Sequence, residues 1–272
     1  MDTCQDLYLD LMKRSLMNLI YGDKEVVPAA PKGAGKQLLV QALRAAGLEA
    51  VRPRKFDPAL RAEGRDWPTY GQTMLSMKRL DNIQFCVEQV IRNEVPGDLI
   101  EAGVWRGGAS ILMRAVLKAY GVRDRYVWVA DSFQGIPPPD PEKYPQDAAI
   151  PYHTFPELSV SQEDVAANFA RYGLLDAQVR FLKGWFRDTL PTAPIERLAV
   201  MRLDGDMYES TMDGLTALYP KLSVGGYVIL DDYGHLPACT QAVEDYRTQN
   251  GITEAIQIID FAGAYWQRRR NG

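Results

Sequence analysis

One segment constrains the fold of this 272-residue chain more than any other, residues 97–112 with the sequence GDLIEAGVWRGGASIL. A short apolar run is followed by a glycine-rich stretch and then by a helical pattern, which predicts a strand, a tight turn and a helix. Glycines at such a turn let a ligand approach the backbone closely, and the N-terminus of the following helix favours negative charge. The segment therefore predicts the first unit of an α/β sheet whose turn suits a nucleotide.

Strand and helix patterns alternate from this segment to the end of the chain. The expected strands comprise residues 99–102, 126–130, 179–182, 198–203, 227–230, 256–259 and 264–267. The expected helices comprise residues 109–120, 163–172, 211–219 and 239–249. Such alternation is typical of a sheet covered by helices on both faces. The predicted fold class is therefore α/β, with a doubly wound, mostly parallel sheet of seven strands.

The N-terminal third has a different pattern. Apolar residues recur at helical spacing in residues 6–20 and again in residues 73–93. Between them, residues 26–65 mix Pro, Gly, Ala and Lys around one short helical patch. We expect residues 1–95 to form an N-terminal helical and lid-like extension, and residues 96–272 to form the ligand-binding core.

A second long segment without periodicity, residues 133–161, is rich in Pro and aromatic residues. A loop of this length in a compact domain is usually disordered or functional. We therefore expect that it also acts as a lid.

Composition excludes several classes of function. The formal net charge of -4 argues against a nucleic-acid partner, which would require a basic surface. The chain contains no apolar run near the ~20 residues of a membrane-spanning helix, and its N-terminus lacks the pattern of a signal peptide. Cys4, Cys86 and Cys239 are too few and too scattered for a disulfide framework or a zinc site. We therefore expect a cytoplasmic protein without nucleic-acid or membrane partners.

Three consecutive predicted strands end in groups that suit a nucleotide-like cofactor. These groups are Glu101, Ala102, Gly103, Val104 and Trp105 after the first strand, Asp131 and Ser132 after the second, and Gly184 and Trp185 after the third. Ligands of open α/β sheets bind beyond the carboxyl ends of the strands, where a carboxylate such as Asp131 commonly binds ribose hydroxyls. Glu101 would repel a pyrophosphate but would stabilise the ammonium and sulfonium groups of S-adenosylmethionine. The pattern therefore favours an S-adenosylmethionine-dependent methyltransferase.

Carboxylates also follow two later strands, where the sequence reads DGD at residues 204–206 and DD at residues 231–232. If these strands are neighbours, Asp204, Asp231 and Asp232 converge and repel one another unless a cation neutralises them or one holds a proton. Oxygen ligands without a nearby cluster of His or Cys favour Mg²⁺. A bound cation lowers the pKa of an acceptor hydroxyl, and Asp204 is the expected base.

Other interpretations stay open from these residues. The DGD sequence matches the Asp-x-Asp motif of metal-dependent glycosyltransferases, although that assignment leaves the later acidic pair without a role. A nicotinamide-dependent oxidoreductase is disfavoured because the glycines of residues 103–108 lack the G-x-G-x-x-G spacing. A non-catalytic module that keeps the fold as an assembly partner is the third alternative.

Five motifs taken together resemble the macrocin O-methyltransferase family. They are EAGVWRGG (residues 101–108), VADSFQG (129–135), GWFRDTLP (184–191), DGD (204–206) and DDY (231–233). The resemblance runs from residues 7–14 to Tyr265 and Trp266, so it covers most of the chain. The family includes sugar methyltransferases of macrolide biosynthesis (tylosin, mycinamicin) and of aminocoumarin biosynthesis (novobiocin).

The resemblance implies an S-adenosylmethionine- and Mg²⁺-dependent O-methyltransferase of the class I fold, which acts on a deoxysugar hydroxyl of a glycosylated natural product and forms a homo-oligomer. By motif position, Thr73 and Met74 would join the cofactor site named above. Asp204, Asp231 and Asp232 would bind the metal, with Asp204 also serving as base.

Two segments depart from the family pattern. Residues 26–55 are longer than in the macrolide enzymes and precede Trp67, and the loop at residues 234–237 contains His235. Trp67 and His235 are therefore the candidate contacts to the acceptor, although a surface loop is the favoured alternative for His235. The acceptor itself is not specified by the resemblance.

Overall fold

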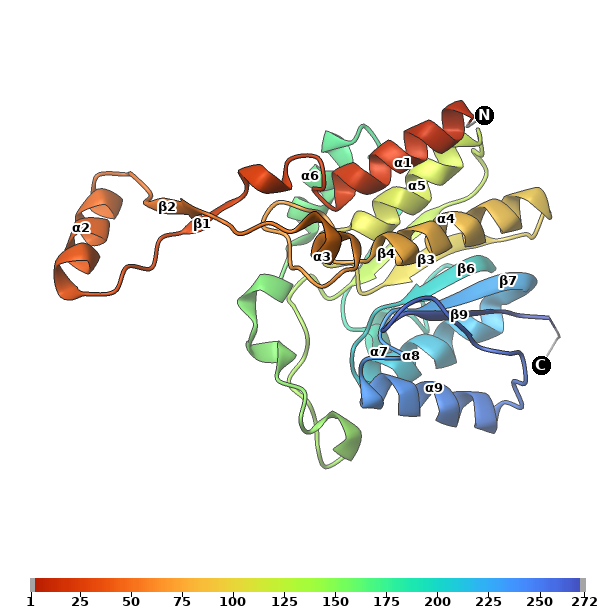
Figure 1. Cartoon of the computed structure of the whole chain (residues 1–272). Helices are drawn as coiled ribbons and strands as arrows, with labels where there is room; N and C mark the ends of the chain where they lie inside the picture. Colours follow the sequence, from red (N-terminus) through yellow and green to blue (C-terminus); the bar gives the residue numbers. More distant parts are fainter. Residues whose placement is uncertain (1–2, 270–272) are drawn as a thin grey trace.

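The computed structural model describes residues 3–269, within which seven strands form the central sheet (Figure 1). The strands are β3 (Asp98–Ala102), β4 (Val127–Asp131), β5 (Val179–Lys183), β6 (Leu198–Leu203), β7 (Leu222–Leu230), β8 (Gln257–Ile258) and β9 (Ala264–Gln267). Their order is β5-β4-β3-β6-β7-β9-β8. The first five strands of this order are parallel, and β9 runs antiparallel to both of its neighbours. The predicted seven-stranded, mostly parallel sheet is confirmed, and its order reverses between β3 and β6.

Helices cover both faces of this sheet, as predicted (Figure 1). One face carries α1 (Cys4–Leu16), α4 (Met77–Arg92), α5 (Gly108–Ala119) and α6 (Gln162–Arg171), and the other carries α7 (Phe186–Thr189), α8 (Tyr208–Leu218) and α9 (Pro237–Gln249). Side chains alternate between two buried clusters, so that Leu99 of β3 joins the first and Ile100 joins the second. Burial on both faces explains why the strands read as continuous apolar runs.

The N-terminal region divides into two parts in the structure. α1 and α4 pack against α5 and share its hydrophobic core. By contrast, β1 (Val26–Pro28), α2 (Ala34–Ala45) and β2 (Val51–Pro53) form an antiparallel hairpin with a helix at its tip, which projects from the body (Figure 1). We call residues 26–53 the hairpin arm. α2 lies wholly in the described part of the chain and buries none of its side chains.

The connecting segments contain short helices. They are α3 (Pro58–Ala62), η1 (Gly22–Lys24), η2 (Pro145–Asp147), η3 (Tyr152–Thr154), η4 (Pro156–Leu158) and η5 (Tyr219–Lys221). Residues 133–161 are anchored through the buried carboxylate of Asp147, which accepts the backbone N–H groups of Tyr208 at 2.6 Å and Glu209 at 3.1 Å. Among residues 3–269, no helix has the length and apolar character needed to cross a membrane.

Candidate functional site

A cavity of about 400 Å³ opens beyond the carboxyl ends of the strands, at the point where the strand order reverses. Most of the residues predicted from the sequence line it: Trp67, Thr73, Met74, Glu101, Gly103, Val104, Trp105, Asp131, Ser132, Trp185, Asp204, Asp231, Asp232 and His235. Ala102 and Gly184 do not. Ala102 is buried within β3, and the N–H of Gly184 donates to the carbonyl oxygen of Asp131 at 2.9 Å. The structure therefore brings the predicted cofactor, metal and acceptor residues into one cavity.

The glycine turn after β3 is shaped by contacts within the protein as well as by access for a ligand. Gly103 has φ of +90°, and a Cβ atom there would lie 1.9 Å from the carbonyl oxygen of Asp204. Gly108 donates its N–H to the carbonyl oxygen of Gln72 at 3.0 Å, and a Cβ atom would lie 2.5 Å from that oxygen. Gly103 therefore allows the ends of β3 and β6 to approach each other, and Gly108 allows the start of α5 to approach residue 72.

The carboxyl group of Glu101 is buried and occupied on both oxygens. Arg202 Nη1 donates to Oε1 at 2.5 Å, and the hydroxyl of Ser110 donates to Oε2. Burial raises the pKa of Glu101 to about 7, against the opposing influence of Arg202. Because a guanidinium already balances this carboxylate, the repulsion of a pyrophosphate expected from Glu101 is weaker than the sequence alone suggests.

Asp131 joins the ends of β3 and β4. Its Oδ2 accepts the N–H of Val104 at 2.8 Å, and its Oδ1 accepts the N–H of Phe133 at 2.8 Å. Burial raises the pKa of Asp131, while these backbone hydrogen bonds oppose that shift. Each carboxylate oxygen can accept more than one hydrogen bond, so the predicted contact with ribose is compatible with this arrangement and stays a prediction.

Three carboxylates gather at the other end of the cavity. One oxygen from each of Asp204, Asp206 and Asp232 lies within 4.8 Å of the others, and we call this group the acidic rim. Oδ2 of Asp232 is buried and accepts no hydrogen bond within residues 3–269. Burial, followed by the neighbouring carboxylates, raises the pKa of both Asp206 and Asp232 well above the usual range. Such a group favours a cation or a shared proton.

Asp231, which the sequence placed in this group, has other partners. Arg202 Nη2 donates to Oδ1 at 2.6 Å, and Arg79 Nη1 donates to Oδ2 at 2.7 Å. Burial alone would raise the pKa of Asp231, but the two guanidinium groups hold it below the usual value. Asp206, which the predicted ligand set did not include, is thus the third carboxylate grouped with Asp204 and Asp232, and the predicted set of Asp204, Asp231 and Asp232 stays a prediction.

Arg202 and Arg79 were not identified from the sequence. Arg202 is 1% exposed and also donates to Asp204 at 3.0 Å, while Arg79 contacts Asp260 at 3.1 Å. An arginine within the apolar run of β6, two residues before Asp204, was the available signal for a buried counter-ion. Arg79 gave no such signal, because it stands 152 residues from its partner Asp231 in the sequence.

Aromatic side chains line another part of the cavity. Trp67, Tyr152, His235 and Phe261 line it, and the His235 ring lies edge-to-face on Phe261 with centroids 5.9 Å apart. Trp67 is 46% exposed. Tyr152 and Phe261 were missed because they come from segments that only the fold brings together. Burial, followed by the carboxylates of Asp206 and Asp232, raises the pKa of the Tyr152 hydroxyl.

Comparison with known proteins identifies relatives that match over nearly the whole chain. The family model described as macrocin O-methyltransferase (TylF) matches residues 5–268. A demethyldecarbamoylnovobiocin O-methyltransferase from Streptomyces niveus is 52% identical over 97% of this chain and 94% of its own length. A mycinamicin III 3''-O-methyltransferase from Micromonospora griseorubida is 51% identical over 97% of this chain and 96% of its own length.

A solved structure is similarly close. The structure of the O-methyltransferase NovP superimposes with a TM-score of 0.85 at 51% identity, covering 98% of this chain and 100% of that one. With 98% of this chain covered, the match includes the sheet and both helical layers.

Proposed function

Because the chain belongs to the macrocin O-methyltransferase family, we propose that it transfers the methyl group of S-adenosylmethionine to a deoxysugar hydroxyl of a glycosylated secondary metabolite. The reaction class predicted from the sequence, S-adenosylmethionine-dependent O-methylation, is confirmed at the level of the family. The glycosyltransferase alternative is set aside for the same reason. The observation that carries the proposal is the presence of the glycine turn and the acidic rim in one cavity.

The cofactor is assigned to the half of the cavity formed by the ends of β3, β4 and β5. Its proposed contacts are the predicted residues that line the cavity: Thr73, Met74, Glu101, Gly103, Val104, Trp105, Asp131, Ser132 and Trp185. The predicted contacts Ala102 and Gly184 do not line it and are left out of the proposed set. S-adenosylmethionine would supply the methyl group from its sulfonium sulfur, which leaves as the neutral thioether of S-adenosylhomocysteine. Glu101 is assigned an indirect role, because its carboxyl oxygens are taken by Arg202 and Ser110.

The acceptor is assigned to the aromatic side of the cavity. Ligand pockets combine apolar and aromatic walls with a few polar groups that fix orientation. Trp67, Tyr152 and Phe261 offer such walls, and His235 offers a polar group. A macrolide or an aminocoumarin glycoside suits this arrangement, and the relatives named for novobiocin and mycinamicin intermediates support that class. A homo-oligomer is part of the same proposal and rests on the family alone.

The acidic rim fits a divalent metal ion such as Mg²⁺. Its donor set consists of carboxylate oxygens, and one of them, Oδ2 of Asp232, is buried without a hydrogen-bond partner in the described chain. Asp204, Asp206 and Asp232 are the proposed ligands, in place of the set that contained Asp231. When bound, a divalent cation would lower the pKa of an acceptor hydroxyl.

Asp204 is the proposed base. Its Oδ2 accepts a hydrogen bond from Arg202 at 3.0 Å, which fixes the side chain at the cavity wall. The carboxylate would accept the proton of the acceptor hydroxyl while the hydroxyl oxygen forms a bond to the methyl carbon and the carbon–sulfur bond breaks. The products are a methyl ether, S-adenosylhomocysteine and a protonated Asp204, which then releases its proton to solvent.

Calorimetric titration tests the cofactor assignment, with S-adenosylhomocysteine run beside UDP and NAD in the presence of Mg²⁺. We expect S-adenosylhomocysteine alone to bind. The Asp204→Ala variant should bind it with similar affinity and should lose about 10²-fold or more of methyl transfer, as expected when a general base is removed. Binding of UDP instead, or full transfer by the variant, would contradict the proposal. Intact cofactor binding by a wild-type protein inactive on every glycoside would favour the assembly module.

Mg²⁺ titration separates the two possible ligand sets. Asp206→Asn and Asp231→Asn each remove one negative charge from neighbouring positions, so they form a matched pair. We expect Asp206→Asn to weaken Mg²⁺ binding about tenfold or more, and Asp231→Asn to weaken it less because its carboxylate is already held by two arginines. The opposite order would restore Asp231 to the ligand set.

A further inference from the structure

One wall of the cavity is an irregular segment, residues 67–74. Trp67 lines the cavity on the acceptor side, and Thr73 and Met74 line it on the cofactor side. The segment lies outside helices and strands. Its backbone N–H and C=O groups therefore need partners from elsewhere in the protein. Those partners determine where the wall stands.

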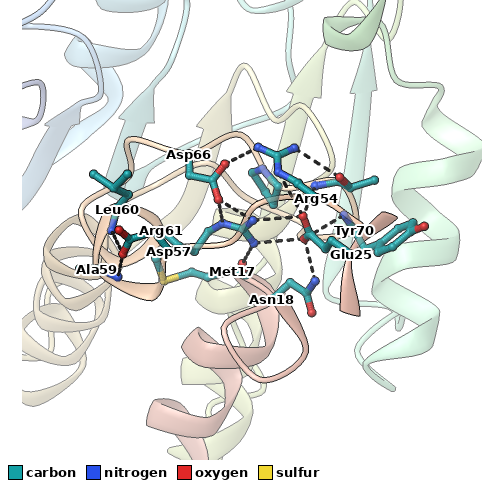
Figure 2. A network of polar contacts seen from close by, with 12 residues as sticks. Met17, Asn18, Glu25, Arg54, Asp57, Ala59, Leu60, Arg61, Asp66 and Tyr70 are labelled. Carbon is teal, nitrogen blue, oxygen red and sulfur yellow. Dashed lines mark hydrogen bonds and ion pairs between the residues drawn. The ribbon is translucent and has the colours of Figure 1, made fainter. Parts of the chain in front are cut away.

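Glu25 supplies partners on one side, at the base of the hairpin arm (Figure 2). Its carboxylate accepts the backbone N–H of Thr69 at 3.1 Å and, more weakly, that of Tyr70 at 3.5 Å. Arg61 donates to both carboxylate oxygens of Glu25 at 3.2 Å. Glu25 is fully buried and Arg61 is 1% exposed, so this contact is screened from solvent.

Two further residues complete this ion cluster, which consists of Glu25, Arg54, Arg61 and Asp66 (Figure 2). Arg61 contacts Asp66 at 2.7 Å, and Arg54 pairs with both carboxylates. Glu25 directly precedes β1 and Arg54 directly follows β2, so the cluster fastens both ends of the hairpin arm next to the wall.

Arg106 binds the carbonyl groups of the same wall. Its Nη1 donates to the carbonyl oxygens of Pro68 at 3.2 Å, Thr69 at 3.0 Å and Gly71 at 2.9 Å. Glu25 thus holds N–H groups of the segment while Arg106 holds its C=O groups. Arg106 itself belongs to the glycine turn that follows β3, between Trp105 and the first residues of α5.

The same turn contacts a second wall of the cavity. The indole Nε1 of Trp105 donates to the carbonyl oxygen of Glu157 at 2.9 Å, within residues 133–161. Asn168 of α6 donates to the carbonyl oxygen of Arg106 at 3.0 Å. The Arg106 guanidinium also lies 4.2 Å from the centroid of the Trp105 ring. Residues 105–106 are therefore a junction between the proposed cofactor turn and the loops around the acceptor side.

From these contacts we propose that Arg106 is a positioning residue that couples the cofactor turn to the wall at residues 67–74, while Glu25 anchors that wall from the base of the hairpin arm. The proposal rests on the assignment of S-adenosylmethionine to the glycine turn. When the cofactor orders the turn, Arg106 is held in place, and its hydrogen bonds then fix the position of the wall that carries Trp67. Loss of Arg106 therefore uncouples acceptor binding from cofactor binding.

Hydrogen exchange measured by mass spectrometry on the peptide covering residues 67–74, with and without S-adenosylhomocysteine, tests this coupling. In the wild type we expect the ligand to slow exchange of this peptide. In Arg106→Met we expect ligand affinity within about threefold of wild type, no slowing of exchange, and a KM for the acceptor raised about tenfold with a smaller change in kcat. Arg106→Lys should recover part of the slowing, because an ammonium can still donate to the wall carbonyls.

Lys118→Met is the matched control. Lys118 lies on α5 and, like Arg106, is a cation that donates to a loop carbonyl, but its acceptor, the carbonyl oxygen of Gly173 at 3.0 Å, lies outside residues 67–74. It should behave like wild type. Equal slowing of exchange in wild type and Arg106→Met would overturn the proposal, as would no recovery in a folded Arg106→Lys. A wild type that fails to bind S-adenosylhomocysteine would instead contradict the proposed function, so the two failures are distinguishable.

Discussion

At the scale of single residues, the site depends on close backbone approach as much as on functional side chains. Gly103 is the clearest case, because the carbonyl oxygen of Asp204 occupies the space that a side chain would need. A glycine at this turn is therefore required even without any ligand. The same contact places the proposed base directly beside the proposed cofactor turn.

Gly103→Ala should consequently destabilise the protein through a steric clash with backbone. Gly121 is the matched control, since it also has positive φ, +69° against +90°, but a Cβ atom added there would meet no other atom of the described residues within 4 Å. We expect Gly121→Ala to cost about 1 kcal/mol from backbone strain alone. Gly103→Ala should cost about 3 kcal/mol or more, because overpacking adds to that strain. Urea unfolding measures both, and equal losses would mean that the clash is relieved without cost.

At the scale of elements, the sequence predicts the sheet well because each strand is short, apolar and bounded by turn residues. All seven expected strands match observed ones, and β7 alone begins five residues early, at Leu222 rather than 227. Gly225 and Gly226 interrupt its apolar pattern there. The hairpin arm was expected only as a lid-like insertion with a helical patch, because its two strands have three residues each and end in proline, which gives no periodic signal.

The candidate site is predictable in its residue types but less so in their partners. Strand-end carboxylates were identified at once, since parallel strands bring their carboxyl ends to one edge. Arg79 helps to decide which carboxylates join the acidic rim. It extends from α4 and neutralises Asp231, which therefore lies outside that group. Such a contact across 152 residues has no local pattern in the sequence. The ion cluster around Glu25 was missed for the same reason.

At the scale of the whole molecule, Glu25 ties together chain segments that are separate in the fold. Its partners come from the turn after α1 (Asn18), from α3 (Arg61), from the chain after β2 (Arg54) and from the cavity wall (Figure 2). Burial alone would raise the pKa of Glu25, but hydrogen bonds from Arg61, Asn18 and Thr69 lower it from 4.5 to about 2. Folding therefore favours the ionised form of the Glu25 carboxylate.

The pH dependence of unfolding follows from this shift. Because the folded pKa lies below the unfolded one, the stabilisation is fully present above about pH 4.5 and is lost as the pH falls towards 2. The difference between the two pKa values corresponds to about 3 kcal/mol. Glu25→Gln should lose about that much stability at pH 7, and its unfolding free energy should fall less steeply than that of wild type between pH 4.5 and 2.

Glu63→Gln provides the control, since Glu63 pairs with Arg65 at 3.4 Å on the exposed surface, where such pairs contribute about 0.5 kcal/mol or less. Chemical unfolding at several pH values should give Glu63→Gln the wild-type profile. The difference between wild type and Glu25→Gln isolates one carboxylate from the other acids that titrate in this range. If the unfolding free energies of wild type and Glu25→Gln differ by a constant amount down to pH 2, the two proteins differ in packing, and the charge of Glu25 does not stabilise the fold.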